Sequence, residues 1–183
     1  MQRMGFILHP LFEFMDRSWV LVGMMGAGKS ALGRELCKLT EREHVDTDLL
    51  LQRRLGRRIP QLFKIYGESA FRDHETSILR GLNPGFSVIS TGGGIVLRDA
   101  NWDQMRRLGI VAFIDVDFEC LCERLDVSKK PRPLLQVEDW KEKLRLLLEE
   151  RLPFYHKADV TVNVTGLTIP DAANAVFERL NEL

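Results

Sequence analysis

Residues 23–30 read GMMGAGKS, a glycine-rich stretch that ends in a lysine and a serine. It follows an apolar run at 19–22 and opens a helical pattern at 29–39, so it joins a strand to a helix. Its form, G-x-x-x-x-G-K-[ST], lets the backbone bend tightly and turn its N–H groups toward a phosphate group. Lys29 then reaches the β- and γ-phosphates of a nucleoside triphosphate, and the Ser30 hydroxyl is suited to bind Mg²⁺. The residues expected to contact ATP in this stretch are Gly26, Ala27, Gly28, Lys29, Ser30 and Ala31.

The rest of the chain alternates between short apolar runs and helical patterns. Strands are expected at 19–22, 44–46, 86–90, 110–114 and 160–164. Helices are expected at 29–39, 49–55, 59–82 with a break at Gly67, 99–108, 117–125, 140–152 up to Pro153, and from Thr168 onward. This alternation predicts an α/β protein with a five-stranded parallel sheet. With the phosphate-binding stretch at 23–30, here called the P-loop, we expect a three-layer α/β/α P-loop kinase fold. Because most of the strands are apolar throughout, both faces of the sheet are expected to be covered.

The length of 183 residues suits one compact domain with a real core. We expect that domain at 18–183, with a substrate-binding segment at about 47–82 and a lid at about 126–138. Residues 1–17 lie outside the pattern, either as a short surface extension or because Met15 is the working start. A signal peptide is disfavoured, because a proline and a glutamate interrupt the apolar character and no small-residue cleavage site follows.

Charge and cysteine content restrict the class of protein. Lysine plus arginine and aspartate plus glutamate balance at 26 each, so the excess positive charge of a non-specific nucleic-acid or membrane binder is lacking. No apolar run has the length of a membrane span. Cys37, Cys120 and Cys122 give no disulfide framework and suit a reducing cytosol. We therefore expect a cytoplasmic monomer that acts on small molecules.

The third expected strand separates this chain from other P-loop proteins. A guanine-reading Asn-Lys-x-Asp motif is absent, which disfavours a GTPase. A motor or transporter ATPase would carry an apolar strand ending in Asp as a second metal anchor. Here the third strand ends in Ser90-Thr91, followed by three glycines at 92–94. Another residue must therefore help to hold Mg²⁺.

Asp46-Thr47-Asp48 supplies the candidate carboxylates. They follow the second expected strand, and ligands gather at the carboxyl ends of strands in such sheets. One carboxylate can face the metal while the other faces an acceptor hydroxyl. Taken alone, Asp-x-Asp is also compatible with a solvated turn.

Further segments with their own chemistry follow in order: Phe71-Arg72, the triple glycine at 92–94, Arg132-Pro-Leu-Leu135, and Arg151 four residues before Tyr155. Each arginine alone is more often a surface residue than a ligand. The combination of G-x-x-G-x-G-K-S, D-T-D, F-R, G-G-G, R-P-L-L and R-x-x-x-Y at these intervals resembles the shikimate kinase family. The resemblance covers nearly all of residues 18–183.

On the donor side, the resemblance implies one Mg²⁺ ion per site, with ATP as co-substrate. Lys29 and Ser30 match the phosphate and Mg²⁺ ligands, and Asp46 matches the residue that supports the metal through water. Such a division of tasks suits phosphoryl transfer, which requires mostly positioning and neutralisation of charge.

The resemblance also implies a lid that excludes water from the closed site. Arg132 matches the lid arginine that swings over the phosphates, and Lys129 and Lys130 add positive charge to the same loop. Arg124 and Pro170 resemble the pair of residues that flank adenine. The lid lysines are equally compatible with an ordinary solvated loop.

On the acceptor side, the resemblance implies phosphorylation of the 3-hydroxyl of shikimate, a step toward chorismate and the aromatic amino acids. Arg72 and Arg151 match the pair that grips the shikimate carboxylate, a task suited to guanidinium groups. Asp48 matches the carboxylate that holds the ring hydroxyls and orients or deprotonates the attacking one. The backbone of Gly92, Gly93 and Gly94 would lie against the ring. Lys29, Asp48 and Arg132 would then be the catalytic residues.

Two other functions stay open at the level of sequence. A related small-metabolite kinase, such as a gluconate kinase, would share the P-loop but is not expected to keep the acceptor residues together. A catalytically silent nucleotide-binding regulator on the same fold is expected to have lost Lys29, Asp46 or Arg132, and all three are present.

Overall fold

The computed structural model describes residues 17–128 and 130–183 of the chain. The expected extension therefore lies outside the described residues apart from Arg17, and so does Lys129. The first half of the chain contains β1 (Ser18–Val22), α2 (Lys29–Thr40), β2 (Glu43–Asp46), α3 (Thr47–Leu55), α4 (Ile59–Gly81), β3 (Ser87–Ser90) and the 3₁₀ turn η1 (Ile95–Leu97). The second half contains α5 (Asp99–Leu108), β4 (Gly109–Asp115), α6 (Phe118–Asp126), the 3₁₀ turn η2 (Pro133–Leu135), α7 (Trp140–Tyr155), β5 (Val160–Asn163) and α8 (Ile169–Asn181).

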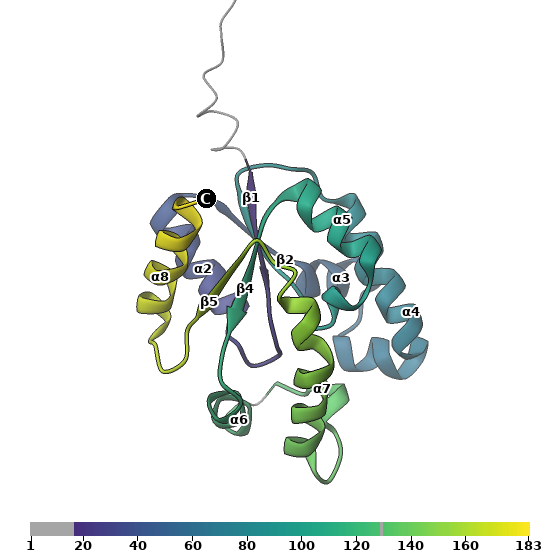
Figure 1. Ribbon diagram of the computed structural model, residues 1–183. Helices are drawn as coiled ribbons and strands as arrows, with labels where there is room; N and C mark the ends of the chain where they lie inside the picture. Colours follow the sequence, from purple (N-terminus) through teal and green to yellow (C-terminus); the bar gives the residue numbers. More distant parts are fainter. Residues whose placement is uncertain (1–16, 129) are drawn as a thin grey trace, which may run out of the picture.

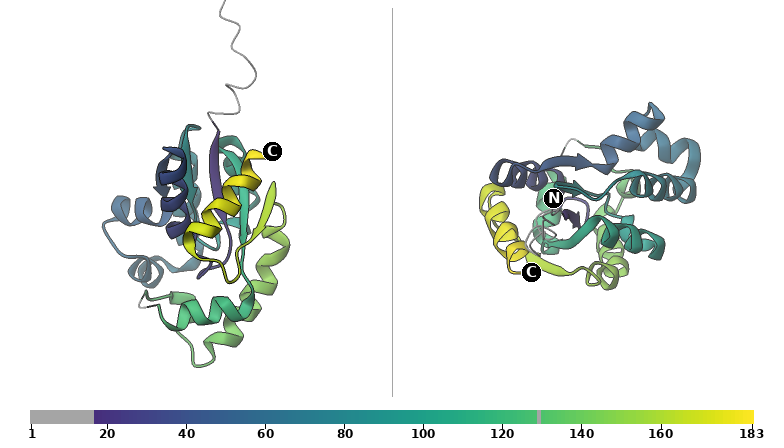
Figure 2. Two further views of the ribbon diagram at one scale, coloured as in Figure 1. Left: turned by 90° about the vertical axis from the view of Figure 1, so that its left-hand side faces the viewer. Right: turned by 90° about the horizontal axis from the view of Figure 1, so that it is seen from above.

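The five strands form one parallel sheet in the order β2-β3-β1-β4-β5. Helices α2 and α8 cover one face, and α4, α5 and α7 lie on the other (Figures 1 and 2). The expected three-layer α/β/α architecture with a five-stranded parallel sheet is confirmed. Among the residues that the model describes, no helix is long and apolar enough to cross a lipid bilayer.

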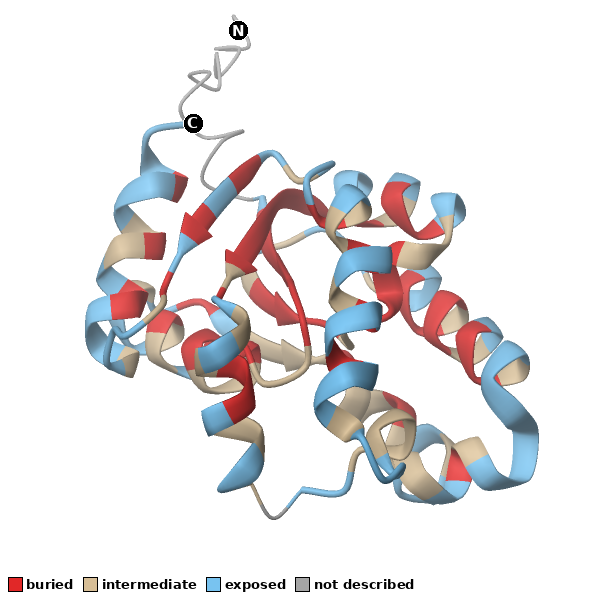
Figure 3. Cartoon of the chain, turned by 60° about the horizontal axis from the view of Figure 1, so that its bottom comes forward, coloured by how far each residue is buried: buried red, intermediate tan, exposed pale blue. Residues whose placement is uncertain are grey.

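Burial follows the position of each strand in the sheet. All residues of β1 and nearly all of β4 are buried at the centre, as their continuous apolar sequences predict (Figure 3). The edge strand β5 alternates between buried and exposed residues, and β2 at the other edge is only partly covered. The sheet and its helices share one large core. Helices α3 and α4 add a small separate core of Leu51, Leu62, Phe71 and Ile78.

Two helices differ from the expectation in ways that affect the site. Helix α3 begins at Thr47 rather than 49, because the Asp46 carboxylate caps it by accepting from the Leu49 backbone N–H. Helix α7 was expected to end near Pro153, but it continues to Tyr155. Pro153 lies in the last turn, where its missing N–H leaves only the Glu149 carbonyl without its usual donor. Glu149 is exposed, so water can donate to this carbonyl instead.

The expected break at Gly67 is confirmed. Its φ of 74° is non-helical, so α4 consists of two helical parts joined at a kink. The second part begins near Gly67 and carries Phe71 and Arg72, both buried. The kink therefore turns this arginine toward the carboxyl ends of the strands.

Candidate active site

The loop between β1 and α2 has the conformation that its glycines predict. Gly26 and Gly28 have φ values of 88° and 90°, which side chains with a Cβ rarely adopt. Gly28 is also the N-cap of α2, so the positive end of this helix faces the space above the loop. The loop is thus a cradle for an anion at the carboxyl edge of the sheet.

Lys29 is buried beside this cradle. Its Nζ donates hydrogen bonds to the carbonyls of Gly23, at 2.6 Å, and Met24, at 3.0 Å. Burial lowers the pKa of Lys29 to about 8, and the nearby Asp48 carboxylate opposes the shift. The ammonium group is therefore held at the loop but is poorly solvated, a state that a phosphate anion would relieve.

A pocket of about 230 Å³ opens above the loop. Its lining comes from the P-loop, the end of β3, α6 and the loop after α6, and includes Gly26, Gly28, Lys29, Ser30, Ala31, Arg124 and Arg132 from the expected nucleotide residues. Ala27 is buried behind the loop, and its carbonyl accepts a hydrogen bond from Arg124 Nη1 at 3.2 Å. Pro170 is exposed and does not line this pocket; its neighbour Ile169 lies closer to the loop, 3.8 Å from a Cβ built on Gly28.

A second pocket, of about 80 Å³, adjoins the first. It contains every residue expected to bind the acceptor: Asp48, Arg72, Gly92, Gly93, Gly94 and Arg151. Phe63, Phe71 and Leu134 give it apolar walls. Asp48 and Arg132 line both pockets, so the two halves of the site meet at these residues.

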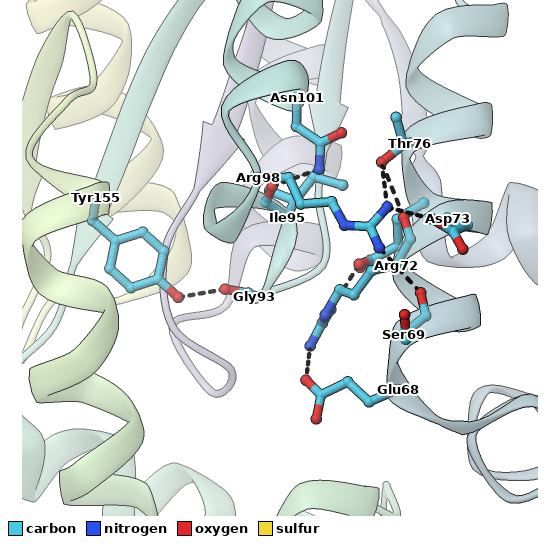
Figure 4. A network of polar contacts seen from close by, with 11 residues as sticks. Glu68, Ser69, Arg72, Asp73, Thr76, Gly93, Ile95, Arg98, Asn101 and Tyr155 are labelled. Carbon is cyan, nitrogen blue, oxygen red and sulfur yellow. Dashed lines mark hydrogen bonds and ion pairs between the residues drawn. The ribbon is translucent and has the colours of Figure 1, made fainter.

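Two carboxylates hold Arg72 against the turn of residues 92–94, here called the glycine turn. It donates to Glu75 at 2.6 Å and to Glu68 at 2.9 Å, the latter visible in Figure 4. A Cβ on Gly94 would lie 2.4 Å from the Arg72 guanidinium carbon, so a side chain at position 94 would displace this guanidinium group. The close contact fixes the guanidinium at the wall of the second pocket.

Arg151 reaches the same pocket from α7. The residue is 1% exposed, yet its Nε and Nη1 atoms have no hydrogen-bond partner among the described residues. A buried cation with unpaired N–H groups is costly unless an anion completes its contacts. This site is therefore suited to an anionic group that reaches Arg151 and Arg72 together.

Glu75 is a site residue that the sequence analysis missed. It is 3% exposed, and burial raises its pKa to about 7 although Arg72 opposes the shift. A Cβ on Gly92 would lie 2.7 Å from its Oε1 and 2.9 Å from Asp48 Oδ1, so the two carboxylates flank that glycine. The signal in the sequence was a carboxylate three residues after Arg72, on the same helical face.

Tyr155 was part of the sequence motif but had no expected role. Its hydroxyl donates to the Gly93 carbonyl at 2.6 Å (Figure 4), and its ring stacks on Phe113. Burial raises its pKa to about 12, so it stays a donor at neutral pH. The extension of α7 through Pro153 places Tyr155 one turn after Arg151, so one helix supports the glycine turn and supplies a buried cation.

The loop after the glycine turn is fixed from the other side as well. Arg98 donates to the Asp73 carboxylate at 2.6 Å and to the Ser69 carbonyl at 3.2 Å, which ties this loop to α4 (Figure 4). Asn101 donates to the Ile95 carbonyl at 2.7 Å. These hydrogen bonds hold the segment after the turn against α4 and α5.

Ser30 and Asp46 fit a magnesium ion. They line one hollow of about 380 Å³ together with Asp48. No cage of three or more His, Cys, Asp or Glu side chains occurs in the described part of the chain. Mg²⁺ normally uses one or two protein carboxylates and completes its octahedron with water and phosphate oxygens. Burial and the neighbouring Asp46 raise the pKa of Asp48, a like-charge repulsion that a bound cation would offset.

Tyr155→Phe tests the support of the glycine turn. The change removes one donor and leaves the Gly93 carbonyl unpaired, so we expect a loss of about 1–2 kcal/mol in the free energy of unfolding and a higher KM for the acceptor. Thermal unfolding and steady-state kinetics measure these two effects. Tyr66→Phe is the control, because the Tyr66 side chain is exposed on α4. Unchanged stability and KM in Tyr155→Phe would contradict this role.

Glu75→Gln tests the buried carboxyl through pH. The pKa of Glu75 in the folded protein is about 7, above its ordinary value of 4.5. The protonated carboxyl group therefore contributes its full stabilisation of the fold below pH 4.5, and this contribution is lost as pH rises through about 7. We expect the free energy of unfolding of the wild type to fall between pH 5 and 8 relative to that of the variant. Urea unfolding across this range measures the difference, and parallel curves would show that Glu75 does not titrate there.

Comparisons with known proteins agree with this geometry. The shikimate kinase family model matches residues 25–181. A shikimate kinase from Thermodesulfovibrio yellowstonii is 36% identical over 165 residues, which cover 90% of this chain and 95% of the relative. One from Microcystis aeruginosa is 42% identical over 151 residues, 82% of this chain and 78% of the relative.

A solved structure of shikimate kinase from Acinetobacter baumannii in complex with shikimate superposes with a TM-score of 0.87. It is 35% identical in sequence, and the match covers 94% of this chain and 98% of that one. The family match spans most of the chain, from within the P-loop to the end of α8. The chain is a phosphotransferase and belongs to the shikimate kinase family.

Proposed function

We propose that the chain transfers the γ-phosphoryl group of ATP to the 3-hydroxyl of shikimate, giving shikimate 3-phosphate and ADP. The observation that carries this proposal is the buried Arg151, which lacks partners for two of its nitrogen atoms beside Arg72 in a pocket adjoining the P-loop. Such a pair of guanidinium groups is suited to a carboxylate. Asp48, between the two pockets, is then placed for a hydroxyl of the same molecule.

On the donor side, the backbone N–H groups around Gly26 and Gly28 and the Lys29 ammonium group bind the phosphates. Ser30 and Asp46 hold Mg²⁺, which supplies neutralisation of phosphate charge when it is bound. Arg124 lies beside the loop with its guanidinium bonded to the Ala27 carbonyl, which supports a contact with the nucleotide. Ile169 joins Pro170 as a candidate for the adenine side.

On the acceptor side, Arg72 and Arg151 orient the carboxylate, and the turn of Gly92, Gly93 and Gly94 allows the ring to approach the backbone. Asp48 accepts a hydrogen bond from the attacking hydroxyl and draws its proton away as the new P–O bond forms. The raised pKa of Asp48 supports this task, because a more basic carboxylate takes a proton more readily.

Arg132 belongs to the proposed lid and lies between the nucleotide pocket and the acceptor pocket. Its side chain lines both pockets, and burial lowers its pKa while Asp48 opposes the shift. Closure of the lid at 126–138 over the phosphates excludes water that would otherwise hydrolyse ATP.

The small separate core of α3 and α4 supports 47–82 as the acceptor-binding segment of a single domain at 18–183. Action as a cytoplasmic monomer belongs to the same proposal.

An ADP-release assay with shikimate, gluconate and quinate at equal concentration tests the acceptor. We expect release with shikimate far above that with the other two. Release with gluconate instead would mean a different small-metabolite kinase, and ATP binding without release on any acceptor would mean a silent nucleotide-binding protein.

Asp48→Asn and Arg72→Ala test the assigned roles. We expect Asp48→Asn to lower kcat by about 100-fold or more, with ATP binding retained in a fluorescence titration. Arg72→Ala should chiefly raise the KM for shikimate, by roughly 30-fold. Asp103→Asn, at an exposed position on α5, is the matched control. Normal turnover by Asp48→Asn would refute the proposed acceptor site.

A further inference from the structure

The balanced charge of the whole chain conceals one strongly basic segment. Residues 49–67 contain four arginines and one lysine but no aspartate or glutamate, although the chain carries 26 residues of each sign. The segment spans most of α3, the turn at Gly56 and the first part of α4. No carboxylate within the segment compensates its charge.

Three of these arginines surround a surface hollow. Arg53, Arg57 and Arg58, here called the arginine patch, are exposed, and they line a hollow of about 460 Å³. Among residues 17–128 and 130–183, no Asp or Glu forms an ion pair with any of the three. Arg54 differs, because its Nη1 donates to Ser77 Oγ at 3.1 Å. The patch is therefore an uncompensated positive surface around a shallow hollow.

The hollow adjoins the active site. It shares Leu49, Gln52 and Arg58 with the hollow of about 380 Å³ that contains Asp48. That second hollow shares Ile59, Arg132 and Pro133 with the acceptor pocket. A row of adjoining hollows, here called the path, thus extends from the arginine patch to the buried guanidinium groups.

We propose that the arginine patch attracts the anionic acceptor and guides it along this path to Arg72 and Arg151. The inference rests on the proposed function, in which the acceptor is a small carboxylate. Exposed cations hold a small anion weakly, but their field raises its local concentration and its rate of encounter. Because screening limits this field to about 10 Å at 0.1 M salt, only a patch at the mouth of the path can act.

The small number of clustered cations favours a small anion over a macromolecule. Three arginines can attract a single carboxylate or phosphate group, whereas a nucleic acid needs a longer row of phosphate contacts. The ring hydroxyls of the acceptor would stay solvated at the patch and become bound only at Asp48. The patch therefore acts on capture of the acceptor and leaves the chemical step unchanged.

The double variant Arg53→Gln/Arg57→Gln tests the proposal. At low ionic strength, kcat/KM for shikimate should fall about 3- to 10-fold with kcat unchanged, and the difference should disappear by about 0.5 M salt. The control, Arg80→Gln/Arg179→Gln, removes two exposed cations from the last turns of α4 and α8. It should leave kcat/KM within about twofold of the wild type.

The methyl ester of shikimate separates charge from shape, because it keeps the ring hydroxyls and loses the negative charge. For this neutral acceptor, the patch variant and the wild type should have equal kcat/KM. An equal loss with the ester, a loss that persists at high salt, or no loss at low salt would each overturn the proposal. Failure of the proposed function would look different, since the wild type itself would not turn over shikimate.

Discussion

The parallel pairing of β1 with β3 fixes the distance between the two halves of the site. Its register places Leu21 opposite Ser90, and the backbone N–H and side-chain hydroxyl of Thr91 both donate to the Leu21 carbonyl, at 3.2 and 2.8 Å. The P-loop and the glycine turn leave these two strands side by side, and a Cβ on Gly93 would lie 3.2 Å from the Met25 nitrogen. The nucleotide and the acceptor substrate can therefore meet, because the neighbouring strands β1 and β3 end at the same level.

Buried charge is the second feature on which the site depends. Lys29, Arg72, Glu75 and Arg151 are all at most 7% exposed, a costly arrangement in a small domain. Arg72 and Glu75 compensate each other, and Lys29 is held by loop carbonyls. Arg151 remains incompletely paired. The protein thus keeps an unfavourable buried cation where a substrate anion would complete its contacts, as functional sites commonly do.

The sequence was sufficient wherever a short motif or an apolar run determined the structure. The P-loop, the order of strands and helices, and the convergence of Asp48, Arg72 and Arg151 on one pocket were all predictable. Contacts between distant residues were not: Tyr155 and Gly93 are 62 positions apart, and their bond depends on α7 continuing past Pro153. The arginine patch was hidden by the balanced total charge, which says nothing about where charges gather.

A crystal structure with shikimate, Mg²⁺ and an unreactive ATP analogue would locate the acceptor in the site. We expect the shikimate carboxylate to lie within about 3 Å of nitrogen atoms of both Arg72 and Arg151. We also expect a ring hydroxyl to contact Asp48 and to point toward the terminal phosphate. A carboxylate bound elsewhere, with Nε and Nη1 of Arg151 still unpaired, would contradict this placement.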